Sequence, residues 1–259
     1  MSMTPTYPPA RDLLKDQVVV VTAAAGTGIG GALARRCAEE GAQLVVSDVH
    51  ERRLGEAAAA IEAETGVVPL AIRCDVTFED DVNALFAGAI DRFGRVDVLM
   101  NNAGLGGTAR IVDMGDAEWA RVLDITLTGT MRCTRAALRH MLPRESGAIV
   151  NNASVLGWRA QAGQSHYAAA KAGVMAFTRC AAMEAAEAGV RINAVAPSLA
   201  MHPFLQKVTT PELLAELTQA EAFGRAAEPW EVANVMVFLA SDLASYMTGE
   251  VLSVSNRHP

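Results

Sequence analysis

Tyr167 and Lys171 are the residues whose types and spacing point most directly to chemistry. They lie four positions apart in an alanine-rich stretch, and positions i and i+4 share one face of a helix. A phenol with a pKa near 10 is a poor base at neutral pH, but a neighbouring ammonium favours the phenolate and lowers that pKa. The pair is therefore suited to exchange a proton with an alcohol or carbonyl oxygen.

Ser154 adds a hydroxyl to this pair. It precedes Tyr167 by thirteen residues, just beyond an apolar run that closes with Asn151 and Asn152, and it can donate a hydrogen bond to the same oxygen. His166, next to Tyr167, is interpreted as a surface histidine, the alternative being a side chain that tunes Tyr167. Because Tyr-x-x-x-Lys also occurs by chance, its meaning depends on the rest of the sequence.

A glycine-rich segment follows the first apolar run. Gly26, Gly28 and Gly31 fit the pattern G-x-G-x-x-G, with a strand predicted before it and a helix after it. Glycines let the backbone turn tightly and approach a pyrophosphate, which sits where the N–H groups of a helix N-terminus are unpaired. A turn that serves packing alone is the alternative. The context favours dinucleotide binding, and the residues expected at the cofactor are Gly26, Gly28, Ile29 and Gly30.

Two aspartates follow the second and third predicted strands. Asp48 lies twenty residues after Gly28, where a carboxylate can accept hydrogen bonds from the adenosine ribose. This position favours NAD over NADP, because the 2′-phosphate of NADP would face a like charge. A helix N-cap is the alternative role for Asp48. Asp75, followed by Val76, is predicted either to bind the adenine amino group or to cap a helix, and the sequence does not favour one of the two.

Short apolar runs alternate with longer amphipathic stretches along the chain. This alternation predicts an α/β protein with a single-domain Rossmann fold, a doubly wound parallel seven-stranded sheet with helices on both faces. Most runs lack polar alternation, as expected for strands covered on both faces. The predicted strands are Val18–Val21, Leu44–Val46, Leu70–Ile72, Val96–Met100, Ala148–Val150, Ile192–Val195 and Val251–Val254.

The Rossmann-fold domain is expected to span 15–259, after an extended N-terminal arm of residues 1–14 that is rich in proline. Residues 198–223 break the rhythm of strands and helices with two prolines around a short helical piece, and are expected to form a substrate lid. Apolar residues of this lid predict a pocket for a bulky apolar substrate. They are Met201, Phe204, Leu205, Leu213 and Leu217.

Composition argues against several other classes of protein. The 259 residues carry a formal net charge of −7, which gives no basic surface for nucleic acid or an anionic membrane. Four widely spaced cysteines argue against a disulfide framework and a zinc site, and favour the reducing cytoplasm. Five histidines are scattered without the spacing of metal ligands. The N-terminus lacks the features of a signal peptide, and no apolar run approaches the roughly 18 residues of a membrane span.

The sequence resembles the short-chain dehydrogenase/reductase family, in its single-domain branch, from about Gln17 to the C-terminus. The resemblance is carried by the glycine-rich segment, Asn101-Asn102-Ala103-Gly104, Ser154, Tyr167-x-x-x-Lys171, Pro197 and Tyr246-Met247-Thr248-Gly249. It implies an enzyme that moves a hydride between a nicotinamide cofactor and a CH–OH group. It also implies a homo-oligomer, a tetramer or dimer built on long helices expected at Glu118–Met141 and Tyr167–Ala188. Further residues that it places at the cofactor are Asn102, Ala103, Gly104, Tyr167, Lys171, Pro197 and Ser198.

Three features depart from the family pattern. The glycine-rich segment is one residue longer than Thr-Gly-x-x-x-Gly-x-Gly, and Ala24 stands in the place of the early glycine. Thr126 stands where the family has an Asn as fourth catalytic residue. We expect it to substitute structurally, with its hydroxyl bonding back within its own helix while its backbone carbonyl holds a relay water. Pro197-Ser198 replaces Pro-Gly, and His202 stands where a Thr often contacts the carboxamide.

The long glycine segment, Trp158-Arg159 and the residues from Ser198 to Phe204 resemble one actinobacterial subgroup linked to the breakdown of steroid rings C and D. The resemblance implies a small-molecule substrate, a steroid-derived hydroxy-hydrindanone held as a thioester. A 3-oxoacyl thioester reductase, acting on an acyl-carrier-protein or CoA ester, is the alternative within the family. A non-catalytic nucleotide-sensing protein is the alternative from another class.

Overall fold

The computed structural model describes residues 4–202, 205 and 210–257. Its strands are β1 (Val18–Thr22), β2 (Gln43–Asp48), β3 (Leu70–Arg73), β4 (Val98–Asn101), β5 (Gly147–Asn152), β6 (Val190–Pro197) and β7 (Val251–Val254). Its α-helices are α1 (Ile29–Glu39), α2 (Glu51–Thr65), α3 (Glu79–Phe93), α4 (Asp116–Leu123), α5 (Gly129–Met141), α6 (Ser165–Ala185), α8 (Pro211–Gln219) and α9 (Pro229–Ala240). All seven expected strands are confirmed, within two residues of their predicted bounds.

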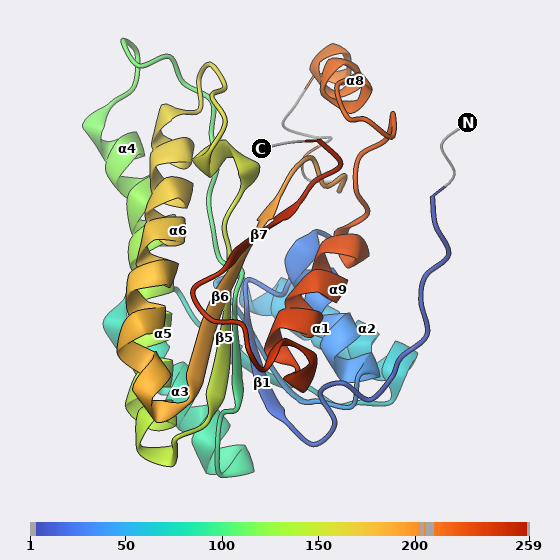
Figure 1. Cartoon of the computed structure of the whole chain (residues 1–259), viewed down its shortest axis with the longest axis vertical. Coiled ribbons are helices and arrows are strands. Elements are labelled where there is room, and N and C mark those ends of the chain that lie inside the picture. The colour runs from blue at the N-terminus through green and yellow to red at the C-terminus, as the bar shows by residue number, and fades with distance from the viewer. Residues whose placement is uncertain (1–3, 203–204, 206–209, 258–259) are drawn as a thin grey trace.

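The strands form one sheet in the order β3-β2-β1-β4-β5-β6-β7, and every pair is parallel (Figure 1). The five inner strands have almost no exposed residue, which explains why they read as continuous apolar runs. The edge strand β3 instead alternates between half-buried and exposed residues. Because the strands are parallel, their carboxyl ends share one edge of the sheet, where ligands of such folds bind.

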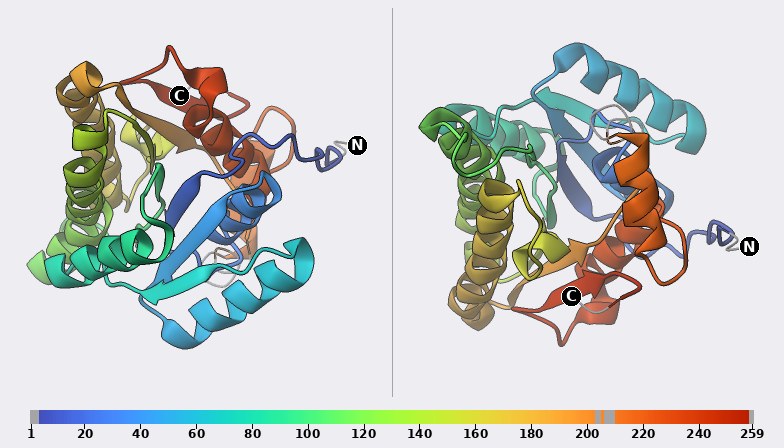
Figure 2. Two further views of the ribbon diagram at one scale, coloured as in Figure 1. Left: turned by 90° about the horizontal axis from the view of Figure 1, so that it is seen from below. Right: turned by 90° about the horizontal axis from the view of Figure 1, so that it is seen from above.

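Helices cover both faces of the sheet, as predicted (Figure 2). The buried residues of α1, α2 and α9 form one core with the sheet, and those of α3, α5 and the C-terminal end of α6 form a second, while Val174 and Met175 of α6 belong to a smaller third cluster. Helix ends follow their local sequence. Gly66 and Gly94 end α2 and α3 in the left-handed conformation, whereas Glu228 and Glu231 form a capping box at the start of α9.

The helix expected at Glu118–Met141 is confirmed as one uninterrupted helical run that contains a π-turn. α4 ends at Leu123, the π-helical turn spans Asp124–Thr128, and α5 begins at Gly129. The periodicity of the sequence cannot reveal this turn, because a π-turn adds one residue without a proline or other breaker. The helix expected at Tyr167–Ala188 is confirmed as α6, which begins two residues earlier and ends in a 3₁₀ turn, Ala186–Ala188.

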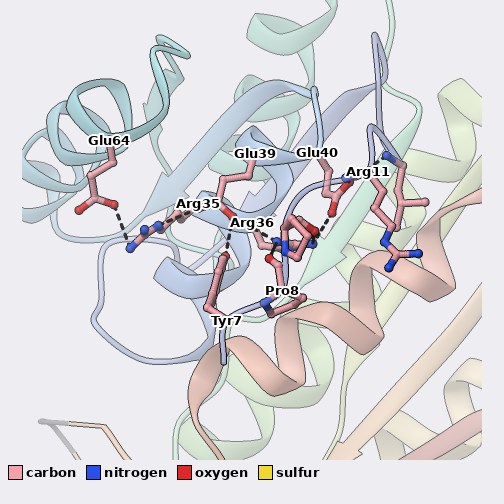
Figure 3. A network of polar contacts seen from close by, with 10 residues as sticks. Tyr7, Pro8, Arg11, Arg35, Arg36, Glu39, Glu40 and Glu64 are labelled. Carbon is pink, nitrogen blue, oxygen red and sulfur yellow. Dashed lines mark hydrogen bonds and ion pairs between the residues drawn. The ribbon is translucent and has the colours of Figure 1, made fainter. Parts of the chain in front are cut away.

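The N-terminal arm lies across α1 and α9 (Figure 3). Arg36 of α1 and Glu40, the residue that follows this helix, are 4% and 0% exposed and form an ion pair with Nη2 and Oε1 2.5 Å apart. Glu40 also accepts the amides of Arg11 and Leu13, and Arg36 donates to two arm carbonyls. Farther along the arm, Tyr7 meets the ring of Trp230 edge-on, with centroids 5.2 Å apart. The arm therefore covers a buried ion pair instead of extending into solvent.

Candidate functional site

A row of asparagines joins the carboxyl ends of the central strands. Asn101 donates from Nδ2 to Oδ1 of Asn151, 2.9 Å away, and Asn151 donates to the Thr178 hydroxyl of α6 at the same distance. One residue further, Nδ2 of Asn152 lies 2.9 Å from Oδ1 of Asn102. These bonds satisfy polar side chains that are buried or half-buried, and they lock the strand ends to one another and to α6.

The three residues expected to do chemistry meet at this edge. Ser154 follows β5, is 9% exposed, and caps a short 3₁₀ turn by accepting the amide of Leu156. Tyr167 and Lys171 lie one turn apart on α6, with Nζ of Lys171 5.6 Å from the centre of the Tyr167 ring. The ammonium donates to the backbone carbonyl of Asn152 at 2.5 Å. The fold thus brings a hydroxyl, a phenol and a buried lysine together from β5 and α6.

The pKa of Tyr167 is shifted in the direction opposite to the one expected from the sequence. Burial raises the pKa of Tyr167 above its ordinary value, against a smaller lowering by the Ser154 side chain. The expectation that Lys171 lowers the pKa of Tyr167 is therefore wrong for the chain alone, since desolvation of the phenolate dominates and the opposing effect comes from Ser154. Burial also lowers the pKa of Lys171 to about 8, because the structure gives this ammonium, only 3% exposed, a carbonyl partner and no carboxylate.

Thr126 lies in the π-helical turn and is completely buried. The expectation that its hydroxyl bonds back within the helix is wrong. The hydroxyl instead accepts the amide of Leu105 at 3.0 Å and donates to the carbonyl of Leu105 at 3.2 Å. The carbonyl of Thr126 accepts the hydroxyl of Thr130. Thr126 therefore joins the π-turn to the loop that follows β4.

The glycine-rich segment packs closely beneath this edge. A Cβ at Gly30 would lie 2.2 Å from the carbonyl oxygen of Ala23, and one at Gly31 would lie 1.9 Å from that of Gly26, so neither position accepts a side chain. Ala23, directly after β1, has a φ of 53°. The position whose backbone conformation favours glycine is therefore Ala23, one residue before the expected Ala24.

The two aspartates have backbone partners. Asp48 ends β2 and accepts the amides of Ala25, in the glycine segment, and His50, at the start of α2, at 3.2 and 3.0 Å. Burial raises the pKa of Asp48 above its usual value. Asp75 accepts both the amide and the hydroxyl of Thr77. Neither aspartate is a helix N-cap, because α2 and α3 begin after His50 and Phe78. Asp75 instead closes a local turn with Thr77, and Asp48 links the glycine segment to the residue before α2 while lying at the carboxyl edge.

The region expected to be a lid contains α8 and an open apolar hollow of about 450 Å³. Met201 lines it as predicted, but Leu213, which is 40% exposed, and Leu217 do not; the residues of α8 that line it include Leu214 and Ala215 instead. Phe204 lies outside the described residues. The end of the region is tied to the C-terminal segment, since Ala222 donates its amide to Asn256. The ring of His202 lies against Gly28: a Cβ at Gly28 would be 3.5 Å from Cγ of His202.

His166 is not on the surface. Its side chain is completely buried, and its Nε2 lies 3.6 Å from Oε1 of Glu118. Sequence reasoning also missed the backbone of Leu105, the loop glycines Gly106 and Gly107, and Glu118. No pattern marks these residues, since they meet through the path of a loop. The only available signal was the glycine pair, which leaves room for a close approach.

All four cysteines are free, as expected. No group of residues that could hold a metal ion occurs within the described part of the chain. Among the helices that the structure describes, none has the length and apolar character needed to cross a membrane.

Comparisons with known proteins agree with this geometry. A family model described as Enoyl-(Acyl carrier protein) reductase matches residues 23–256. The chain is 61% identical, over 100% of its length and 99% of the relative's, to (5R,7aS)-5-hydroxy-7a-methyl-1-oxo-2,3,5,6,7,7a-hexahydro-1H-indene-carboxyl-CoA reductase of Mycobacterium tuberculosis. It is 36% identical to the 3-oxoacyl-(acyl-carrier-protein) reductase of Thermotoga maritima, over 93% of this chain and 97% of that protein. A crystal structure of a short-chain dehydrogenase from Mycobacterium smegmatis is 56% identical and superposes with a TM-score of 0.88, covering 100% of this chain and 99% of that one.

Proposed function

The chain belongs to the short-chain dehydrogenase/reductase family, and we propose that it moves a hydride between NAD and a secondary alcohol or ketone on a bulky, ring-containing thioester. Membership makes it an oxidoreductase with a nicotinamide cofactor, so the non-catalytic alternative is not retained. The observation that carries the proposal is the meeting of Ser154, Tyr167 and Lys171 at the carboxyl edge of the sheet.

The residues at this edge fit a dinucleotide. The first turn of α1 has no capping side chain and no acidic residue, so its N–H groups suit a diphosphate, beside Gly26, Gly28, Ile29 and Gly30. Asp48 would accept the hydroxyls of the adenosine ribose, which favours NAD. Asp75 and Val76 would lie at the adenine. Residues assigned to the rest of the cofactor are Asn102, Ala103, Gly104, Tyr167, Lys171, Pro197 and Ser198.

Proton movement falls to the chain's own side chains. When bound, the nicotinamide ring supplies or accepts the hydride. In the reducing direction the Tyr167 hydroxyl gives its proton to the carbonyl oxygen, and in the oxidising direction the phenolate takes the proton from the alcohol. Ser154 donates a hydrogen bond to the same oxygen. Because burial alone raises the pKa of Tyr167, the Lys171 ammonium is needed to favour the phenolate, and Thr126 holds the neighbouring loop in place.

The substrate class rests on two observations. The hollow beside α8 is lined mainly by apolar side chains, which suits a fused-ring body better than a sugar. The relative that is 61% identical is named for a hydroxy-indene carboxyl-CoA, a ring alcohol on a thioester. We therefore favour a steroid-derived hydroxy-hydrindanone thioester, and the lower identity to the Thermotoga maritima reductase makes a 3-oxoacyl thioester the weaker candidate.

We also propose a cytoplasmic homo-oligomer, a tetramer or a dimer. Large apolar side chains are exposed on α4 and α6, as at Trp119 and Met183, and near the C-terminus at Leu243 and Tyr246. Such patches are typical of surfaces between subunits. Light scattering coupled to size exclusion measures the assembly, and a monomer at micromolar concentration would contradict this proposal.

The test of the proposed activity is turnover of the hydroxy-hydrindanone CoA thioester, a 3-oxoacyl thioester and a short polar sugar, each with NAD(H) and NADP(H). Tyr167→Phe keeps the ring but removes the transferable proton, so we expect turnover to fall by at least about 100-fold while dinucleotide affinity is unchanged. Near-normal turnover of Tyr167→Phe would refute the mechanism. Activity on the sugar alone would refute the substrate class.

A further inference from the structure

Two consecutive glycines of the loop between β4 and α4 lie against two consecutive residues of α6. A Cβ at Gly106 would lie 3.7 Å from Cδ2 of Tyr167, and a Cβ at Gly107 would lie 3.1 Å from Nε2 of His166. The second distance is shorter than ordinary van der Waals contact. The loop backbone therefore follows the first turn of α6 closely, directly beside the candidate acid–base residue.

His166 is unusual for a buried histidine. Its side chain has no exposed surface, and neither ring nitrogen has a hydrogen-bond partner within the described residues. Removing an imidazole from water without a partner costs free energy, so apolar packing alone does not account for this residue. The carboxylate of Glu118 on α4 lies 3.6 Å from its Nε2, and the Glu118 side chain is 45% exposed.

Glu118 and His166 enclose Gly107 between them. A Cβ at Gly107 would lie 3.4 Å from Oε1 of Glu118 as well as 3.1 Å from the imidazole. A side chain at this position would therefore press on both groups. α4, the loop and α6 meet at this point, one residue from Tyr167.

Hydrogen bonds hold the loop on both sides of this point. Before the glycines, Leu105 is bonded to Thr126 through both its amide and its carbonyl. After them, Thr108 accepts a hydrogen bond from the side chain of Gln164, and Ala109 donates its amide to the carbonyl of Gly163, each at 3.0 Å. The glycines between these anchors lie against the Tyr167 ring and against the His166–Glu118 pair.

We propose that His166 and Glu118 together position Tyr167, by holding Gly106 against one side of its ring. His166 is thus a positioning residue that acts through Tyr167, and the inference rests on the proposed acid–base role of Tyr167. Without the contact between His166 and Glu118, the loop moves away from α6 between its two anchors. The Tyr167 phenol is then free to rotate away from Ser154. Small misplacements of this kind reduce turnover, because catalysis depends on alignment of the reacting atoms.

The test compares His166→Leu with His166→Gln in the full-length protein. Leucine fills the space without polar atoms, whereas the glutamine amide can still donate to Glu118. With the hydroxy-hydrindanone CoA thioester as substrate, we expect His166→Leu to lower kcat by roughly 10- to 100-fold with KM within about threefold. His166→Gln should stay within about threefold of the wild type. Glu118→Leu should behave like His166→Leu, and Asp116→Asn, which removes a charge from the same turn of α4, should have no effect.

Hydrogen–deuterium exchange gives a readout that needs no activity. We expect faster exchange of the amides from Gly106 to Ala109 in His166→Leu and Glu118→Leu, and wild-type exchange in His166→Gln. Unchanged exchange and kcat in His166→Leu would overturn the inference. An equal loss of kcat in His166→Gln would also overturn the inference, since the volume of the side chain would then matter more than its contact with Glu118. A failure of the proposed function is distinguishable, because it would appear as undiminished turnover in Tyr167→Phe.

Discussion

The hydroxyl of Thr126 is bonded to both polar backbone atoms of Leu105, accepting from the amide at 3.0 Å and donating to the carbonyl at 3.2 Å. One short side chain thus satisfies a backbone residue that has left β4 and has no strand partner. We therefore propose that Thr126 serves here as an anchor for the loop beside Tyr167, where the family has an Asn.

Thr126→Val tests this anchor. Valine keeps the shape but removes both hydrogen bonds, so we expect the free energy of unfolding to fall by about 1–3 kcal/mol, the cost of a buried unsatisfied polar group. Turnover should fall as well, whereas Thr126→Asn should change it by less than about tenfold. Urea unfolding and steady-state kinetics measure the two effects. A hundredfold gain of turnover in Thr126→Asn would mean that the wild type lacks a catalytic group.

Asp48 should set the choice of dinucleotide. Two like charges about 4 Å apart repel by roughly 4 kcal/mol at an effective dielectric constant near 20, and solvent reduces this further. We therefore expect the wild type to prefer NAD over NADP by about 2–3 kcal/mol, or roughly 30- to 150-fold in kcat/KM. Asp48→Ala should abolish most of this preference.

Arg53 provides the control for that prediction. It is exposed on α2 and its charge acts on Asp48, so it is the cation best placed to attract a 2′-phosphate. Arg53→Ala should weaken any residual use of NADP and leave NAD unaffected. Equal use of both dinucleotides by the wild type would show that Asp48 does not face the ribose.

Lys171 should make stability depend on alkaline pH. Its pKa of about 8 in the folded chain lies below the ordinary value of 10.5, so the unfolded chain binds more protons between these values. Stability contributed by this residue therefore rises as the pH increases from 8 to 10.5. The free energy of unfolding of the wild type, relative to Lys171→Met, should increase over this range by up to roughly 3 kcal/mol. Lys15→Met, at an exposed position, should show no such trend, and parallel curves for wild type and Lys171→Met would contradict the prediction.

Replacing Ala23 with glycine should stabilise the folded chain. At a φ of 53°, a Cβ costs about 1–2 kcal/mol, which exceeds the entropy that glycine loses on folding. We expect Ala23→Gly to raise the free energy of unfolding by about 1 kcal/mol. Ala24→Gly is the matched control: this neighbour is not among the residues with positive φ, and its substitution should destabilise the chain. A similar decrease in the free energy of unfolding of both variants would show that the backbone at Ala23 is not strained.

Periodicity and spacing were enough to predict the seven strands, their parallel arrangement in one sheet and the grouping of Ser154, Tyr167 and Lys171. Each depends on a strand or helix whose pattern is visible locally, and parallel strands bring their carboxyl ends to one edge without further information. The left-handed conformation of Ala23, one residue before the family's early glycine position at Ala24, was not predicted, because a sequence pattern counts positions but carries no dihedral angles.

Features that depend on contacts between distant elements were not predictable. His166 seemed a surface residue since histidine commonly is, and only the path of the β4–α4 loop buries it. The raised pKa of Tyr167 arises from desolvation, a property of the packed state, whereas the spacing showed only the nearby lysine. Leu213 and Leu214 differ in role because of the rotation of α8, which adjacent apolar residues on a short helix do not determine.

The N-terminal arm has a consequence for the order of assembly during synthesis. Its contacts with Arg36 and Glu40 join residues about 30 positions apart, but Tyr7 cannot reach its ring partner until Trp230 has been made, roughly 220 residues later. The two attachments of the arm therefore form at different times. We expect the arm to be fully protected from proteolysis only once α9 has packed.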